Sequence, residues 1–271
     1  MVPYGDIEAL EAVLAKHECA AFIVEPIQGE GGIVVPPDGY LKAAEEACHA
    51  HGALLILDEI QTGFGRTGTM FAAEHDGAEP DIMATAKSLG GGVMPIGAYT
   101  ATTAVREAGY GTMDTCVLHT STFGGNAWAM AAGLKSIEIF VRDNLAEEAR
   151  RKGERFKAGL DRIAADRHLI KEVRGRGLML GVEFYEPKVG KALSHEYLAA
   201  SISALLLQDH GIITAYTLNN PNVIRFEPPL IVTDEQIDRA LDAFEQVCRH
   251  HHGIAGAFAG LGRTMLTHRK R

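Results

Sequence analysis

Residues 54–68 read Leu-Leu-Ile-Leu-Asp-Glu-Ile-Gln-Thr-Gly-Phe-Gly-Arg-Thr-Gly, and residues 85–97 read Thr-Ala-Lys-Ser-Leu-Gly-Gly-Gly-Val-Met-Pro-Ile-Gly. The run from 54 to 57 is apolar on both faces, which is typical of a central parallel strand covered by helices. Asp58 follows at the carboxyl end of that strand, where open α/β sheets bind ligands. The first segment therefore predicts an α/β domain with a binding site at this edge of its sheet.

Lys87 lies between a short apolar segment and three glycines, at positions 90–92. The absence of side chains there lets backbone and ligand approach closely. A lysine can form an imine with an aldehyde cofactor, and a partly desolvated lysine can also carry protons. Pyridoxal phosphate needs such a lysine and a carboxylate that keeps its pyridine nitrogen protonated. Lys87 and Asp58 are the candidates for these two groups.

Other interpretations of the same residues have to be weighed. An apolar run that ends in Asp-Glu is also the form of the Walker B strand of nucleotide hydrolases. However, the chain contains no G-x-x-x-x-G-K-[ST] motif, and Lys87 precedes its glycines instead of following them. This disfavours an ATPase, whereas a solvated surface lysine remains the simplest interpretation of Lys87 taken alone.

Six motifs occur in one order along the chain. Besides the two segments above, they are Phe-Ile-Val-Glu-Pro-Ile-Gln-Gly-Glu-Gly-Gly-Ile-Val-Val-Pro-Pro-Asp-Gly-Tyr at 22–40, His-Thr-Ser-Thr-Phe-Gly-Gly-Asn at 119–126, Val-Arg-Gly-Arg-Gly-Leu-Met-Leu-Gly at 173–181 and Val-Ile-Arg-Phe-Glu-Pro-Pro-Leu at 223–230. Together they resemble the class III aminotransferases, which are pyridoxal-phosphate enzymes of fold type I. The resemblance extends from about residue 2 to about residue 250 and includes the ornithine, acetylornithine, 4-aminobutyrate and putrescine aminotransferases.

The resemblance implies that five residues bind the cofactor, pyridoxal 5'-phosphate. Lys87 would be the catalytic lysine that forms the imine and shuttles protons, and Asp58 would pair with the pyridinium nitrogen. Ile60 would press on the pyridine ring, and Gln61 would hydrogen-bond the phenolic oxygen of that ring. Thr122 would bind the cofactor phosphate across a dimer interface.

The resemblance also implies two substrate-binding residues. Arg225 would clamp the carboxylate of an amino or keto acid, a task that suits a planar guanidinium. Glu30 would pair with Arg225 when the other substrate brings no carboxylate, so that one pocket serves two substrates. Taken alone, Glu30 could be an exposed loop carboxylate and Arg225 a surface arginine at a strand end.

The implied fold class is α/β: a three-layer large domain with a partial, mostly parallel sheet over residues 1–140, then a smaller α+β domain over 141–252 and a tail over 253–271. The implied reaction moves an amino group from an ω-amino acid or diamine donor, with putrescine-like donors favoured, to a 2-oxo acid such as 2-oxoglutarate or pyruvate. A homodimer or larger assembly is expected. The alternative is a non-catalytic remnant that acts as an interaction or dimerisation module.

Relatives carry an amino-terminal portion before the stretch that begins here at Val2, and it supplies several strands of the large sheet. We therefore expect the chain to be a fragment, the product of a truncated reading frame, or one half of a split enzyme; in the last case a separate amino-terminal half would be a further partner. The sheet beginning at Ala20 would then have an uncovered edge, which favours pairing or aggregation.

The composition of the 271 residues bears on three properties: nucleic-acid binding, the use of the cysteines and membrane insertion. The net charge of -9, with both signs interspersed, argues against a nucleic-acid surface. The four cysteines form no C-x-x-C pair, which favours neither zinc nor disulfides and indicates a reduced, cytoplasmic location. No apolar run approaches the roughly 20 residues needed to span a bilayer, and no signal peptide is evident.

Two clusters of basic residues invite other interpretations. Three consecutive histidines at 250–252 end a predicted helix and more often complement its dipole than bind a metal, so no metal site is predicted. Arg174 and Arg176 flank Gly175 and could recognise a phosphate. They match a motif of the family's small domain, however, which favours a structural turn.

The pattern along the chain also predicts its secondary structure. Helices are expected over 6–16, 38–51 with Asp38 as N-cap, 126–142, 147–166, 194–209 and 234–250, and strands over 20–25, 54–57, 96–101, 171–173, 178–184, 212–215 and 223–226. Residues 63–68 are expected to form a mobile glycine loop.

Overall fold

The computed structural model describes residues 1–185 and 198–250, and the contacts of the chain divide it into two compact units. Unit 1 comprises residues 1–27 and 36–147, and unit 2 comprises residues 28–35 and the chain from 148 onward. The short segment 28–35 is therefore surrounded by unit 1 in the sequence but belongs to unit 2. The domain boundary predicted near residue 140 stays a prediction. It differs from the two units in one respect, because it leaves residues 28–35 in the first domain.

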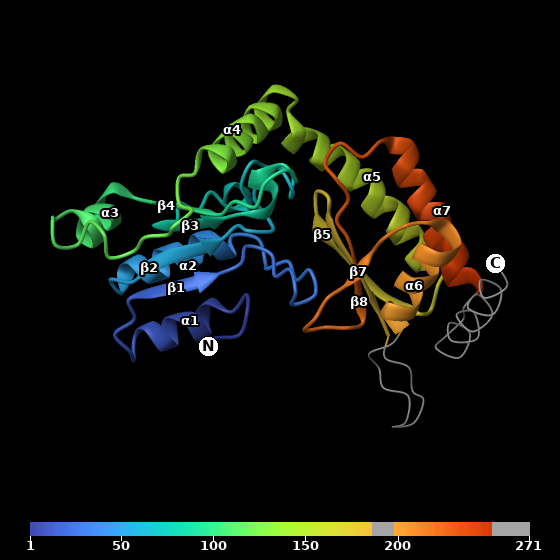
Figure 1. Cartoon of the computed structure of the whole chain (residues 1–271). Helices are drawn as coiled ribbons and strands as arrows, with labels where there is room; N and C mark the ends of the chain where they lie inside the picture. The colour runs from blue at the N-terminus through green and yellow to red at the C-terminus, as the bar shows by residue number, and fades with distance from the viewer. Residues whose placement is uncertain (186–197, 251–271) are drawn as a thin grey trace. The chain divides into compact units, whose positions relative to one another are not determined.

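Unit 1 is built on one sheet of four strands (Figure 1). Its elements are α1 (Ile7–Leu14), β1 (Ala21–Val24), α2 (Tyr40–Ala50), β2 (Leu54–Asp58), the 3-10 helix η1 (Ala72–His75), β3 (Ile82–Thr85), the 3-10 helix η2 (Lys87–Gly90), β4 (Ala98–Ala101), α3 (Thr103–Tyr110) and α4 (Ala127–Arg142). The strand order is β1-β2-β3-β4. The pairs β1–β2 and β2–β3 are parallel and β3–β4 is antiparallel, which confirms the expected mostly parallel sheet.

The core of unit 1 lies between this sheet and the helices α1 and α2. Leu55 and Leu57 of β2 are fully buried there with Leu10 of α1 and Leu41 of α2, whereas the alternate residues of β2 are only partly buried. Because successive side chains of a strand point to opposite faces, Asp58 shares the less buried face. This placement leaves the carboxylate accessible at the end of a well-packed strand.

The outer strands of the sheet have one neighbour each among the described strands. Ile23 on β1 is 64% exposed and Tyr99 on β4 is 51% exposed. Both edges therefore present apolar side chains beside unpaired backbone groups.

Three sequence-based expectations for unit 1 need correction. The N-cap of α2 is Gly39, with φ 80° and no side-chain hydrogen bond, and not Asp38. The backbone N–H of Leu41 instead donates to Asp76 Oδ2 at 3.0 Å. Within the expected glycine loop, Phe64 and Thr67 are 6% and 2% exposed, so this segment is packed and is not a surface loop. Strand β3 and helix α3 were not expected.

Unit 2 is an α+β unit with an antiparallel sheet in the order β5-β6-β8-β7. Its elements are α5 (Leu145–Ala165), which begins at the end of unit 1, then β5 (Ile170–Arg176), β6 (Met179–Phe184), α6 (Leu198–His210), β7 (Ala215–Tyr216), β8 (Val223–Phe226) and α7 (Asp234–His250). The strand expected over 212–215 begins only at Ala215. Residues 194–197 of the helix expected over 194–209 lie outside the described residues.

Aromatic rings join the helices and the sheet of unit 2. Phe226 on β8 contacts Phe156 of α5 and Phe244 of α7 in edge-to-face geometry, with centroids 5.3 and 5.4 Å apart. On the surface, Arg155 of α5 binds Asp238 of α7 at 2.7 Å. Within the described ranges, no helix is both long enough and apolar enough to cross a membrane.

Candidate active site

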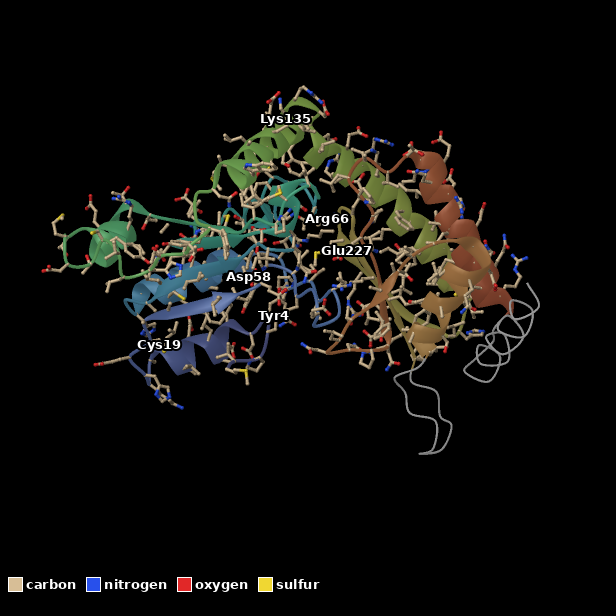
Figure 2. All side chains as sticks on the ribbon, viewed as in Figure 1. Tyr4, Cys19, Asp58, Arg66, Lys135 and Glu227 are labelled. Atoms are coloured by element: carbon tan, nitrogen blue, oxygen red, sulfur yellow. The ribbon has the colours of Figure 1, made fainter. Side chains whose placement is uncertain are left out.

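Asp58 and Lys87 lie at the same edge of the sheet of unit 1. In the parallel register of β2 and β3, Asp58 is opposite Ala84, and Lys87 comes two residues after Thr85, the last residue of β3. Figure 2 shows Asp58 at the end of its strand. The carboxylate is half-buried and the lysine is exposed. The carboxyl ends of two neighbouring parallel strands thus bring together the acid and the amine that the sequence singled out.

The backbone at Lys87 is unusual. Its φ of 43° lies in the left-handed region, which residues other than glycine seldom adopt. Such a conformation persists only where the surroundings hold it, and it is concentrated at functional sites. Here Leu89, which is 6% exposed, anchors the 3-10 turn that Lys87 begins.

The glycines after Lys87 make room for a helix. A Cβ atom on Gly91, whose φ is 59°, would lie 2.3 Å from Ser136 Oγ of α4. The sequence predicts that a ligand approaches the backbone at these glycines. At Gly91 it is helix α4 that approaches the backbone instead. Helix α4 supports the turn that presents Lys87.

The loop after Asp58 is held by carboxylates. Asp58 Oδ1 accepts a hydrogen bond from the N–H of Ile60 at 3.0 Å. The next residue, Glu59, is fully buried and accepts from the N–H of Ala73 at 2.8 Å and from the hydroxyl of Thr62. Burial raises the pKa of Glu59. Ile60 and Gln61 follow, both partly buried.

Glu59 is a residue that the search for functional groups missed. The alternation of a strand contains the signal, because Asp58 and Glu59 must face opposite sides. One carboxylate remains at the accessible edge while its neighbour fixes the segment that carries Ile60 and Gln61.

Thr122 lies in an exposed turn before α4. The N–H of Gly124 donates to the carbonyl of Ser121 at 3.1 Å, and the side chain of Asn126 caps α4 by accepting from the N–H of Ala129 at 3.0 Å. The role implied for Thr122 involves a second subunit, so it stays a prediction.

The two predicted substrate residues form an ion pair in unit 2. Arg225, on β8, places Nη1 at 2.6 Å from Glu30 Oε1. The other oxygen of Glu30 accepts from the backbone N–H of Leu218 at 3.0 Å. Glu227 Oε2 lies 4.0 Å from Nε of Arg225. The guanidinium of Arg225 is thus flanked by the carboxylates of Glu30 and Glu227, and the carboxylate of Glu30 is also held by the N–H of Leu218.

A cavity of about 740 Å³ adjoins Arg225 within unit 2. Most of its lining is apolar, including Ile212, Phe226, Pro229 and Ile237. The hydroxyl of Thr214, also in the lining, is buried without a hydrogen-bond partner. The cavity places an apolar wall and one unsatisfied hydroxyl next to the guanidinium.

The predicted residues fall into two groups by unit. Asp58, Ile60, Gln61, Lys87 and Thr122 lie in unit 1, and Glu30 and Arg225 lie in unit 2. The donor set of the first group suits pyridoxal phosphate, because it offers a primary amine for the aldehyde and a half-buried carboxylate for the ring nitrogen.

The comparisons with known proteins assign the family. The family model described as "Aminotransferase class-III" matches residues 4–248. The chain belongs to the class III aminotransferases. Members of this family use pyridoxal 5'-phosphate.

Individual relatives agree with this assignment. The putrescine aminotransferase of Pectobacterium atrosepticum is 45% identical over 258 residues, which are 93% of this chain and 52% of that protein. The ornithine aminotransferase of Toxoplasma gondii, described with partial occupancy of PLP at its active site, matches with a TM-score of 0.80 at 40% identity, over 90% of this chain and 55% of that one. The acetylornithine aminotransferase of Elizabethkingia anophelis matches with a TM-score of 0.81 at 34% identity, over 92% and 62%. The chain thus spans about half to three-fifths of the length of these relatives.

In the part of the chain that the structure describes, no group of three or more His, Cys, Asp or Glu side chains could hold a metal ion. The four cysteines are free thiols. Residues 251 and 252 of the histidine run, and the tail, lie outside the described residues.

Proposed function

We propose that the chain carries the cofactor lysine and the substrate arginine of a pyridoxal-phosphate-dependent aminotransferase. The enzyme would move an amino group from an ω-amino acid or diamine donor, putrescine-like by preference, to a 2-oxo acid such as 2-oxoglutarate or pyruvate. The observation that carries this proposal is the position of Asp58 and Lys87 at one edge of the parallel sheet. The identity of 45% with a putrescine aminotransferase supports the choice of donor.

The chain's own residues have distinct tasks in this proposal. When bound, pyridoxal phosphate supplies an electron sink for the substrate's reacting carbon. Lys87 holds the cofactor through its Nζ and, once released, moves a proton with the same atom. Asp58 keeps a proton on the ring nitrogen, Ile60 covers the ring, and Gln61 hydrogen-bonds its phenolic oxygen.

The pair of Glu30 and Arg225 accounts for the exchange of substrates. A diamine brings no carboxylate, so Glu30 stays on Arg225 at 2.6 Å and neutralises it. A 2-oxo acid competes for the guanidinium with its own carboxylate, which can bind in a bidentate manner. Glu30 then retains the hydrogen bond from the N–H of Leu218, so one of its carboxylate oxygens keeps a protein partner.

The assembly is also part of the proposal. Thr122 would bind the phosphate of the cofactor held by a second subunit, which requires at least a homodimer. The exposed position of Thr122 in its turn is compatible with contact to another chain. A cytoplasmic location remains a prediction from the cysteine pattern.

Cofactor binding by the purified chain tests the proposal directly. We expect a yellow complex with pyridoxal phosphate, and borohydride should trap the cofactor on Lys87, as peptide mapping would show. Lys87→Ala should abolish the trapped adduct. Asp58→Asn should weaken cofactor binding about tenfold or more, because it removes the partner of the ring nitrogen's charge. Absorbance measures cofactor binding by each variant, and mass spectrometry detects the trapped adduct.

Lys135→Ala is the matched control, since Lys135 is an exposed lysine on α4 that pairs with Glu138 on the same helix at 2.5 Å. This variant should bind the cofactor as the wild type does. An adduct that survives in Lys87→Ala would refute the assignment of the lysine. A wild-type chain that forms no adduct would favour the non-catalytic interaction module.

A further inference from the structure

The segment that carries Glu30 is a strained hairpin. Gln28 and Val34 pair through two backbone hydrogen bonds of 3.0 and 3.1 Å, and Glu30 lies between them. Ile33 is fully buried with φ 53°, and Gly32 has φ 116°. A β-branched residue in the left-handed region is a genuine outlier. It persists only where the surrounding structure fixes it.

Arg174 on β5 provides that fixation. Its Nε donates to the carbonyls of Gly32 and Ile33 at 3.0 and 3.1 Å, and its Nη2 donates to Gly32 at 2.7 Å. Its Nη1 donates to Glu172 at 2.7 Å and to Glu183 at 2.5 Å. The side chain is only 13% exposed. The two carboxylates hold the guanidinium in place, and the guanidinium holds the hairpin.

The packing around the hairpin allows little movement. A Cβ on Gly32 would lie 3.2 Å from Arg174 Nη2 and 3.3 Å from Cβ of Asn220. A Cβ on Gly181 would lie 2.9 Å from Cβ of Ile33. Glycines at both positions therefore let the hairpin lie directly on the sheet of unit 2, where Arg174 reaches its carbonyls.

The hairpin also contacts the turn between β7 and β8. The carbonyl of Glu30 accepts from the N–H of Asn219 at 3.0 Å, and its carboxylate accepts from the N–H of Leu218 and pairs with Arg225. Arg174 thus holds the hairpin that carries Glu30, and the turn between β7 and β8 holds Glu30 itself.

We propose that Arg174 is a positioning residue that sets how firmly Glu30 occupies Arg225, and thereby the balance between carboxylate-bearing and amine-only substrates. This inference rests on the proposed function of the Glu30 and Arg225 pair. Arg174 acts through Glu30 and touches no substrate itself. Recognition of a phosphate by Arg174, considered from the sequence, is disfavoured because its donors already serve two carbonyls and two carboxylates.

Loss of Arg174 has a defined direction of effect. Without the hydrogen bonds from Arg174, the strained hairpin relaxes and Glu30 pairs with Arg225 for a smaller fraction of the time. The carboxylate of an incoming substrate then competes less with Glu30 for the guanidinium of Arg225. Arg174→Gln should therefore bind 2-oxoglutarate about threefold to tenfold more tightly, and Glu30→Gln at least as much. The double variant should gain no more than Glu30→Gln alone, because both changes act on the same contact.

Two measurements on the full chain test this. Titration calorimetry gives the affinity for 2-oxoglutarate, and NMR hydrogen exchange follows the N–H groups of Leu218 and Asn219, which should exchange at least about fivefold faster in Arg174→Gln. Arg174→Lys keeps the positive charge but cannot reach both carbonyls and both carboxylates, so it should lie between the wild type and Arg174→Gln. Arg155→Gln, which removes an arginine paired with Asp238 in the same unit, should change neither quantity.

The outcomes separate the two ideas. If Leu218 and Asn219 exchange at the wild-type rate in a folded Arg174→Gln or Arg174→Lys, the positioning role is overturned. Arg174→Lys decides the matter if Arg174→Gln does not fold. If Glu30→Gln leaves the affinity for 2-oxoglutarate unchanged, the substrate role of the pair falls and the inferred effect on substrate balance falls with it. If Glu30→Gln changes that affinity and Arg174→Gln does not, only the inference about Arg174 is wrong.

Discussion

At the scale of single residues, Glu59 stabilises the segment that follows Asp58 at the edge of the sheet of unit 1. Its buried carboxylate accepts from the N–H of Ala73 and from the hydroxyl of Thr62. Glu59→Ala should lower the free energy of unfolding by about 1–3 kcal/mol, because a buried donor loses its acceptor. Glu59→Gln keeps an oxygen acceptor and should cost less. Urea unfolding followed by circular dichroism measures both.

The cost of Glu59→Gln should also depend on pH. Burial raises the pKa of Glu59 above its ordinary value of 4.5, so the folded state binds the proton more tightly than the unfolded state. The stability that this group contributes is complete below 4.5 and is lost as the pH rises through the folded pKa. Relative to the wild type, Glu59→Gln should therefore gain stability as the pH rises above 4.5. The hydrogen bond from Lys135 lowers the pKa of Glu138, so the stability that this group contributes is present above 4.5 and is lost as the pH falls. Relative to the wild type, Glu138→Gln should therefore gain stability as the pH falls below 4.5. A parallel trend in both variants would contradict this account.

The residue scale is also where sequence reasoning reached furthest. The sequence predicts that Asp58 and Lys87 lie at one edge of the sheet, and the register of β2 and β3 places them there, whereas their roles toward a cofactor stay a prediction. The pairing of Glu30 with Arg225 was expected from the resemblance, and the ion pair forms at 2.6 Å. The contacts of Arg174 could not be predicted from the sequence. Its partners include the backbone carbonyls of Gly32 and Ile33, and a backbone carbonyl produces no local sequence pattern near Arg174.

At the scale of elements, the N-terminus of α2 shows where local patterns fail. The residue before a helix usually caps it, and Asp38 has a suitable side chain. The structure places Gly39 at the cap, and Asp76, from the loop after η1, accepts from the N–H of Leu41 at 3.0 Å. By contrast, the bounds of β8 and α7 were predicted correctly, because their periodicity is strong and their ends carry local signals.

The cap from Asp76 gives a prediction for α2. Asp76→Ala should lower the free energy of unfolding by about 0.5–2 kcal/mol, as the loss of a helix cap does elsewhere. Asp161→Ala is the control, since Asp161 makes an exposed ion pair with Lys157 along α5, and such a pair contributes about 0.5 kcal/mol or less. Chemical denaturation of both variants distinguishes them. Equal losses would mean that the contact between Asp76 and Leu41 does not cap α2 in solution.

At the scale of the whole molecule, each unit has a cysteine in its core. Cys48 in unit 1 and Cys248 in unit 2 are fully buried, and burial raises their pKa values to about 11 and about 12. At pH 8 the thiolate fraction of Cys48 is therefore on the order of one in a thousand, before its shielding from reagents is considered. Cys116 is exposed and should react first. The two buried thiols are thus separate reporters of the two cores.

Matched core substitutions then test whether the two units unfold independently. Leu55 in unit 1 and Leu205 in unit 2 are both fully buried, and replacing either with alanine should cost about 2–5 kcal/mol. Leu55→Ala should expose Cys48 to a thiol reagent at lower urea and leave Cys248 unchanged, and Leu205→Ala should do the reverse, as mass spectrometry of labelled peptides would show. If either substitution shifts both cysteines equally, the units unfold as one. In that case the segment 28–35, which carries Glu30 into unit 2 and is continuous at both ends with unit 1, would couple the stabilities of the two units.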